Sequence, residues 1–436
     1  MAPTPALIMA GLLLAMLAAE AAAEEGEAGT TTGTSVIEAD GDGAMHINSS
    51  DPLTQPVFFN GVNVLGVIEQ QRSTLEQQRA AMAQFNQTLR EQRSLTSQQR
   101  AKISTLQERM CGLGQPLGLS KIPGLSSNRD KWAGGVLAPS GLIYGIPHGA
   151  TSVLIINPNT HTLDTTTISG LPTTGLKWHD GVLAPSSNVI YCMPSHEGRV
   201  LKIDPSTNTA DWTTIAGLGS ALYKFRGGVL GHDGLIYGVP YSAQYVLIID
   251  PVTDTVDTTT LSGLDPALYK WWGGVAAPDG RIFCMPRSFG SVLVISPETS
   301  SWDVTSIAGV SQGLSNWSGA VLASNGLVYG IPNGVTFAVV VDPERMAADT
   351  SSITGLSSAG AWIGGVAAAN GKVVGIPFNA DSLLVIDPST NTADTTTFTG
   401  AGTDASKYNG GVLAPNGLVY AMPANAESVL VIDVGC

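Results

Sequence analysis

A phrase of about 17 residues is written seven times along the second part of this chain. The first copy, KWAGGVLAPSGLIYGIP from Lys131 to Pro147, combines an aromatic residue, a glycine pair, two short apolar runs, a turn and a closing proline. The closing prolines recur 45 to 47 residues apart, at Pro147, Pro194, Pro240, Pro286, Pro332, Pro377 and Pro423. Such a regular period indicates repeated copies of one structural unit.

Each unit predicts four short strands. In residues 364–398 the runs GGVAA, KVVGIP, SLLVID and TADTTTF are separated by residues that favour turns, such as Asn-Gly and Asp-Pro. Four strands in a unit of this length are typical of a propeller blade. The predicted fold class is therefore all-β, a seven-bladed β-propeller over residues 111–436.

The last copy ends before its fourth strand. Upstream of the first copy, LSKIPGLSSNRDKW (Leu119–Trp132) matches the fourth-strand text TTTISGLPTTGLKW (Thr165–Trp178). We therefore expect a strand near Ile122 to complete the seventh blade, which would leave no open blade edge.

The unit VVGIPFNADSLLVIDPSTNTADTTTFTG resembles the YVTN-type β-propeller repeats, and the likeness extends over residues 115–436. The resemblance implies a secreted or cell-surface propeller that binds partners, with some enzymes among its relatives. It assigns no catalytic residue to this chain.

The N-terminal part has a different composition. Residues 1–23 contain the apolar run ALIMAGLLLAMLA, which is too short to span a bilayer and predicts a cleaved signal peptide, with an uncleaved membrane anchor as the alternative. Residues 24–56 form an acidic linker rich in Gly and Thr. The mature protein is therefore expected to be secreted or extracellular, with no membrane span.

Residues 57–110 predict a coiled-coil oligomerisation stalk that resembles the stalks of trimeric fibre proteins. From Val67 to Cys111 there is no Gly or Pro, and apolar residues recur every seven positions, at Ile68, Leu75, Met82, Leu89, Ile103 and Met110. The expected partner is the chain itself, in a parallel oligomer with a trimer favoured. A single amphipathic helix that packs on the globular domain is the alternative.

The charge of the chain excludes one class of function, and its cysteines predict a disulfide. With 21 Lys and Arg against 35 Asp and Glu, the chain has no basic patch for nucleic acid. The repeat alignment places Cys111 and Cys436 in one turn and predicts a disulfide between them, whereas Cys192 and Cys284 are expected to be buried thiols. Sequons at Asn48, Asn86 and Asn316 permit N-glycosylation.

Candidate ligand-binding residues are those that vary between copies while the frame stays fixed. They follow the opening aromatic or the closing proline, or precede the aromatic: Lys131, Lys177, Lys224, Lys270, Lys407, Arg226, Trp272, Tyr241, Arg287 and Phe378. We expect them to ring the channel mouth and bind an extracellular protein or glycan, for adhesion or matrix recognition. The alternatives are solvated loop variation and lysine stems that merely cover the neighbouring aromatics.

An enzyme is the second hypothesis. The second copy gathers His179, Asp180, His196 and Glu197, and Asp180 replaces a glycine present in every other copy. Such a cluster would suit a lyase or a glycosidase-like activity. The sequence predicts no metal ligand set and no cofactor.

Overall fold

The computed structural model describes residues 35–39, 45–49, 58–59, 62–63, 67–68, 70–85, 87–88, 117–310, 313, 315–357 and 359–435. The chain divides into two compact units, Met1–Lys102 and Ile103–Cys436. Each unit is described separately below.

The first unit contains two strand pairs and a helix. Strand β1 (Ser35–Ala39) pairs antiparallel with β2 (Met45–Ser49) inside the region expected to be a linker, and β3 (Phe58–Phe59) pairs with β4 (Val62–Asn63). Helical residues occupy 67–68, 70–85 and 87–88, and the apolar side chains of Ile68, Leu75 and Met82 are exposed. The structure supports this short helix and not the long coiled coil: residues 58–59 and 62–63 of the predicted stalk form strands, and its remaining residues lie outside the described ranges. None of the described helical residues forms a segment with the length and apolarity needed to cross a membrane.

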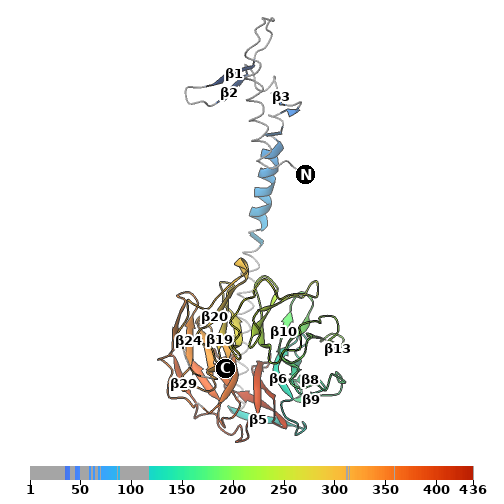
Figure 1. Ribbon diagram of the computed structural model, residues 1–436, viewed down its shortest axis with the longest axis vertical. Coiled ribbons are helices and arrows are strands. Elements are labelled where there is room, and N and C mark those ends of the chain that lie inside the picture. The colour runs from blue at the N-terminus through green and yellow to red at the C-terminus, as the bar shows by residue number, and fades with distance from the viewer. Residues whose placement is uncertain are drawn as a thin grey trace. The chain divides into compact units, whose positions relative to one another are not determined.

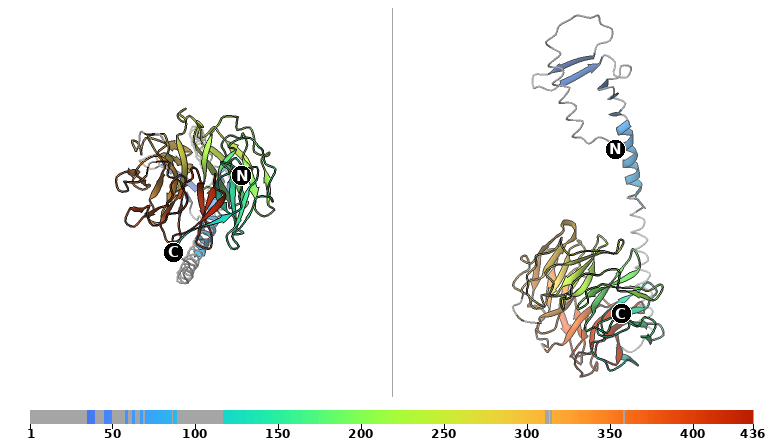
Figure 2. Two further views of the ribbon diagram at one scale, coloured as in Figure 1. Left: turned by 90° about the horizontal axis from the view of Figure 1, so that it is seen from below. Right: turned by 45° about the vertical axis from the view of Figure 1, so that its right-hand side comes forward.

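The second unit is a ring of seven four-stranded antiparallel sheets (Figures 1 and 2). The innermost strands, which contact each other around the ring, are β6 (Trp132–Leu137), β10 (Trp178–Ala184), β14 (Phe225–Leu230), β18 (Trp271–Ala276), β22 (Trp317–Leu322), β26 (Trp362–Ala367) and β30 (Tyr408–Leu413). The second strands are β7 (Ile143–Pro147), β11 (Val189–Pro194), β15 (Ile236–Pro240), β19 (Ile282–Pro286), β23 (Val328–Pro332), β27 (Val373–Pro377) and β31 (Val419–Pro423).

The third strands are β8 (Leu154–Asn157), β12 (Leu201–Asp204), β16 (Leu247–Asp250), β20 (Leu293–Ser296), β24 (Val339–Asp342), β28 (Leu384–Asp387) and β32 (Ser428–Asp433). The outer strands are β9 (Thr162–Asp164), β13 (Thr209–Asp211), β17 (Thr255–Asp257), β21 (Ser301–Asp303), β25 (Ala347–Asp349), β29 (Thr392–Asp394) and, in the last blade, β5 (Gly118–Pro123). One turn of 3-10 helix, η1 (Pro297–Thr299), joins β20 to β21. The predicted seven-bladed propeller and its closure by an N-terminal strand are confirmed.

The inner strands approach each other unusually closely. Each carries a bulge near its start, as between Trp317 and Ala320, and a glycine with positive φ lies in the bulge of every blade except the second. A Cβ added to Gly273 would lie 2.8 Å from the Cα of Gly319. Glycine is therefore required where the strands meet around the axis, and only β10 carries a side chain there, that of Asp180.

A ring of backbone hydrogen bonds joins neighbouring blades and accounts for the two ends of the repeated phrase. In the first blade, the N–H of Lys131 donates to the carbonyl of Ala424 in the last blade at 3.0 Å, and the N–H of His148 donates to the carbonyl of Lys131 at 2.9 Å. Equivalent bonds recur in every other blade. The residue before the opening aromatic is thereby tied to the residue after the closing proline, and both come to the same face.

The aromatic that opens the phrase fills the core between blades. Trp178, Trp271 and Trp317 are completely buried. Their indole N–H groups donate to backbone carbonyls of Arg199, Ser291 and Phe337, at 2.8, 2.8 and 3.2 Å. A buried indole needs such a partner, so the tryptophan both fills space and fixes the loop that follows the second strand.

Candidate functional site

Two sets of variable positions meet where the inner strands begin, at one end of the ring axis. One set follows the opening aromatic, and the other follows the closing proline of each blade. Because the backbone ring ties these positions together, we call this group of residues the axial mouth. All its members are buried except Arg287 and Phe378, which are half-buried, and they are Ala133, His179, Arg226, Trp272, Ser318, Ile363, Asn409, His148, Ser195, Tyr241, Arg287, Asn333, Phe378 and Ala424.

Two arginines from different blades contact one tryptophan at the axial mouth. The guanidinium carbon of Arg226 lies 4.8 Å from the ring centroid of Trp272, and that of Arg287 lies 4.5 Å from it. Arg226 also lies 5.4 Å from the ring of Tyr241. We call Arg226, Arg287, Trp272 and Tyr241 the arginine cage; aromatic faces attract cations in this geometry.

Neither guanidinium has a carboxylate partner among the described residues, because the ion pairs found there involve other side chains. Arg226 is 6% exposed, and its Nε is buried without a partner in the described chain. Arg287 is half-buried and donates to the hydroxyl of Ser318 and to Oδ1 of Asn333 at 3.2 Å. Burial lowers the pKa of Arg226 to about 10, and the charge of Arg287 adds to that effect. The cage therefore holds two desolvated positive charges that an anion would stabilise.

Neutral donors and acceptors surround the cage. The ring of His179 lies edge-on to Trp272 with centroids 5.2 Å apart, and both its nitrogens are buried without a partner in the described residues. The hydroxyl of Ser195 is likewise buried without a partner in the described residues. Burial lowers the pKa of His148 and of His179 well below the usual value, so both imidazoles are neutral near pH 7.

The five lysines do not form the positive ring that the sequence predicts. Lys131, Lys177, Lys224, Lys270 and Lys407 are each at most 2% exposed. In four of them Nζ donates to the carbonyl three residues earlier, as Lys224 does to Ala221 at 2.8 Å; Lys177 lacks a partner among the described residues. Their burial corrects the expectation of a lysine-rich mouth, because the ammonium groups support loops and do not face solvent.

Other side chains and backbone groups contact the alternative catalytic residues. His196 packs edge-on against Tyr223 at 4.3 Å, and Glu197 is bonded to the hydroxyl of Thr174. Asp180 Oδ1 accepts the N–H of Gly181 at 2.9 Å, and burial raises the pKa of this carboxyl to about 6. No hydrogen bond found in the described residues joins any two of His179, Asp180, His196 and Glu197.

The remaining sequence predictions have mixed outcomes. Phe378 packs beside Tyr241, Trp272 and Ile363 at the axial mouth. Cys192 and Cys284 are free and buried, as expected, whereas Cys111 and Cys436 lie outside the described residues. Asn316 is completely buried and donates to the carbonyl of Gly313 at 3.2 Å, so the folded propeller leaves no room for a glycan on it. Asn86 and the side chain of Asn48 lie outside the described part of the chain.

A groove opens beside the arginine cage. It has a volume of about 620 Å³ and lies between loops of the third and fourth blades. We call it the lateral groove; its lining includes Leu222, Tyr223, Ser242, Tyr245, Leu268 and Tyr269. Tyr223 belongs to both sites, since its ring also contacts the guanidinium of Arg226 at 5.6 Å.

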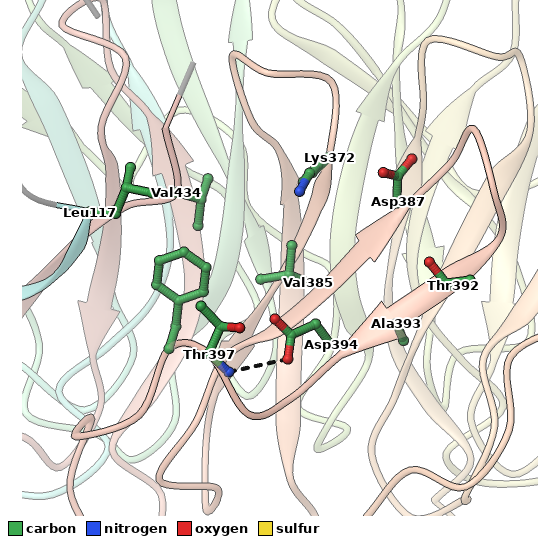
Figure 3. Close-up of a pocket in the computed structure, with 10 residues that line it drawn as sticks. Leu117, Lys372, Val385, Asp387, Thr392, Ala393, Asp394, Thr397 and Val434 are labelled. Atoms are coloured by element: carbon green, nitrogen blue, oxygen red, sulfur yellow. Dashed lines mark hydrogen bonds between the residues drawn. The ribbon is translucent and has the colours of Figure 1, made fainter.

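A second concavity, of about 320 Å³, lies at the rim near Leu117 and Val434 (Figure 3). Its polar side chains include Asp394, whose carboxylate accepts the N–H of Thr397 at 3.1 Å. Asp394 therefore already serves as the acceptor of a turn.

The fold and the site together define a seven-bladed β-propeller with a cationic and aromatic axial mouth. No protein-family model matches the chain, and no curated protein matches its sequence. Among solved structures it is similar to virginiamycin B lyase from Staphylococcus aureus, with a TM-score of 0.58 and 11% identity over 73% of this chain and 100% of that one. A streptogramin B lyase gives a TM-score of 0.56 at 11% identity, covering 72% and 97%.

The extracellular domain assigned to a hybrid two-component system of B. thetaiotaomicron gives a TM-score of 0.54 at 12% identity, over 72% of this chain and 42% of that one. Likenesses at this level of identity show the shared fold alone, because one propeller scaffold serves unrelated functions.

Sequence reasoning found the cage residues but missed several neighbours. Tyr223 and Tyr269 directly precede a lysine of the repeated phrase, and their φ angles are 55° and 62°. Four of the other blades carry Asp130, Ser315, Gly360 or Ser406 at this position, and these residue types suit a left-handed conformation better; the second blade carries Leu176, which does not have a positive φ. Two tyrosines at this position of the repeat were the feature of the sequence that could have identified these neighbours of the cage.

Proposed function

We propose that this propeller is an extracellular binding module that captures an acidic ligand at its axial mouth. One observation carries the proposal: Arg226 and Arg287 contact the same ring of Trp272, and neither has a carboxylate partner among the described residues. A buried charge without a counter-ion is costly, so an incoming anion gains from both guanidiniums at once.

The surroundings suit a ligand that also accepts and donates hydrogen bonds. The nitrogens of His179 and the hydroxyl of Ser195 are buried without partners in the described residues, and such groups cost free energy until a ligand or water satisfies them. An acidic glycan or an acidic protein segment combines these features. The proposal also includes that the repeats are of the YVTN type and that the module acts in adhesion or matrix recognition.

Direct titration of the full-length protein tests it. Acetate, sulfate and a uronic-acid oligosaccharide are titrated by calorimetry at low and high salt, beside a neutral oligosaccharide of equal length. At least one acid should bind, and Arg287→Gln should weaken that binding at least tenfold, about 1.4 kcal/mol. Arg345→Gln is the matched control, because Arg345 lies on an exposed turn and pairs with Asp342. Binding of no acid, or binding that Arg287→Gln leaves unchanged, contradicts the proposal.

Secretion and self-association complete the proposal. The apolar run in residues 6–18 and the extracellular domain among the similar folds support secretion. The exposed Ile68, Leu75 and Met82 lie one heptad apart on the described helix and support a parallel oligomer, with a trimer favoured. Several mouths on one assembly would add avidity for a repetitive surface. Sedimentation of the full chain and of an Ile68→Ser/Leu75→Ser variant checks this; a monomeric full chain at micromolar concentration contradicts it.

A further inference from the structure

The lateral groove and the arginine cage adjoin each other at Tyr223 and Tyr269. Tyr223 contacts Arg226 on one side and lines the groove on the other, and Tyr269 lies 5.1 Å from Tyr241 of the cage while also lining the groove. We propose that the groove binds the apolar part of a small amphipathic carboxylic acid whose carboxylate lies in the cage. This inference rests on the proposed function and narrows its ligand class.

The lining of the groove favours an apolar group over a sugar. Leu222 and Leu268 are each 59% exposed, although leucine gains most when buried. Tyr269 is 40% exposed beside them. No acidic residue lines the groove, and its volume of about 620 Å³ lies in the range of small-molecule sites. An apolar ligand group would cover both leucines and the tyrosine face.

The groove also carries little free charge. Lys224 is its one cationic lining residue, and its Nζ donates to the carbonyls of Ala221 and Ser195 at 2.8 and 3.2 Å. The ammonium is thus occupied and buried. The other cation in contact with the groove lining is Arg226, whose guanidinium lies 5.6 Å from the ring of Tyr223, so the acidic end of a ligand belongs in the cage and its apolar end in the groove.

Backbone strain at Tyr223 and Tyr269 also supports a ligand that spans the cage and the groove. Tyr223 and Tyr269 both have positive φ, a conformation that is unfavourable for an aromatic residue. Aromatic residues occupy this position only in the two adjacent blades that flank the groove. Their rings are placed where a ligand spanning cage and groove would pass.

Three related probes separate the two parts of the site: 4-phenylbutyrate, butyrate and 4-phenyl-1-butanol. Each is titrated against the full-length protein by calorimetry. We expect 4-phenylbutyrate to bind at least tenfold more tightly than butyrate, which lacks the apolar group, and than 4-phenyl-1-butanol, which lacks the charge.

Two variants localise the effects. Leu222→Ser/Leu268→Ser should bring the affinity for 4-phenylbutyrate to within about threefold of that for butyrate, and leave butyrate unchanged. Val252→Ser is the matched control, since Val252 is 78% exposed on a turn outside the groove lining, and it should change neither affinity. Arg287→Gln should weaken both acids and spare the alcohol.

The outcomes distinguish this inference from the proposed function. Equal affinities for butyrate and 4-phenylbutyrate, or no effect of the leucine substitutions, overturn the groove assignment while acid binding at the cage stands. Equal binding of 4-phenylbutyrate and 4-phenyl-1-butanol, insensitive to Arg287→Gln, overturns the joined site. If oligosaccharide acids bind and 4-phenylbutyrate does not, the amphipathic ligand class is wrong and the proposed function remains.

Discussion

Ile122 pairs with Val429 across the seam that closes the propeller ring. The pairing continues through the six residues of β5, from Gly118 opposite Asp433 to Pro123 opposite Ser428. The last blade therefore takes three strands from the C-terminal end of the chain and its outer strand from the beginning of the domain.

Removal of the closing strand should destabilise the whole propeller. A chain that begins at residue 132 lacks β5 and leaves β32 as an open edge, which invites pairing with other molecules. We expect a lower melting temperature and concentration-dependent light scattering. A chain that begins at residue 112 retains β5 and is the control. Equal melting of the two truncated chains would refute the importance of the seam.

Two buried lysines should respond oppositely to replacement by methionine. Lys224 donates to two carbonyls, so Lys224→Met should cost about 1 to 3 kcal/mol of unfolding free energy. Lys177 has a buried Nζ without a partner among the described residues, and burial lowers its pKa to about 8, so Lys177→Met should be neutral or stabilising. Urea denaturation at pH 7 measures both. Equal losses of unfolding free energy in the two variants would mean that the carbonyl contacts of Lys224 do not stabilise the fold.

The glycines around the axis should tolerate alanine poorly. Gly319 has φ 118°, and a Cβ there would lie 2.8 Å from the Cα of Gly364, so Gly319→Ala must separate two inner strands. We expect a loss of about 3 kcal/mol or more, beyond the strain of the backbone alone. Gly326 also has positive φ but faces open space, so Gly326→Ala isolates the backbone strain, about 1 to 2 kcal/mol. Thermal unfolding of both variants gives the comparison.

The carboxylates at the ends of the outer strands should make stability fall in acid. The hydroxyl of Thr397 and the N–H groups of Thr396 and Thr397 donate hydrogen bonds to Asp394, and these contacts lower its pKa to about 2; Asp164 and Asp349 behave alike. Because the folded pKa is below the unfolded value, this contribution is complete above pH 4 and is lost as the pH falls toward 2.

Melting temperatures between pH 7 and pH 2 test the effect. Asp394→Asn should lower the melting temperature at pH 7 and show a smaller decrease between pH 4 and pH 2. Glu344→Gln is the control, because the backbone of Glu344, not its carboxylate, takes part in its turn. Parallel acid profiles for Asp394→Asn and the unmodified protein would contradict this account.

Asp180 should reduce stability in its present position. Its φ is 66° in a slot where the other blades have glycine, and burial raises its pKa to about 6. A raised carboxyl pKa means that stability decreases as the pH rises from about 4 to 6 and stays lower above that. Asp180→Gly should therefore raise stability by about 1 to 3 kcal/mol at pH 7.5 and by less at pH 4. Lower stability of this variant at pH 7.5 would show that the carboxylate has a stabilising partner.

The prediction of seven blades from sequence rested on the repeat itself. The spacing of the prolines, the turn pairs and the alternation of short apolar runs are local features, and each is read within one unit. Even the closure was predictable, because the text around Ile122 matches the fourth strand of other units. Of the predicted stalk, the structure supports only the helical residues 67–68, 70–85 and 87–88, because a heptad pattern indicates helicity without fixing where the helix ends.

The repeat also marked Arg226, Trp272, Tyr241 and Arg287 as variable positions, and these meet in the arginine cage. The repeat could not predict in which direction a side chain points. Lys224 was expected at the surface and is buried, where its Nζ donates to the carbonyls of Ala221 and Ser195. Asn316 carries a sequon and occupies the equivalent buried slot.

Sequence alone thus determined the unit, its number and the positions free to vary, since all three follow from a period that repeats within the chain. Only the tertiary structure decided that Arg226 and Arg287, from the third and fourth blades, contact the ring of Trp272. Neither arginine has a carboxylate partner among the described residues. The tertiary structure also placed Tyr223 and Tyr269 between cage and groove. The reason is physical: contacts between blades depend on how closely the inner strands approach around the axis, and no single unit contains that information.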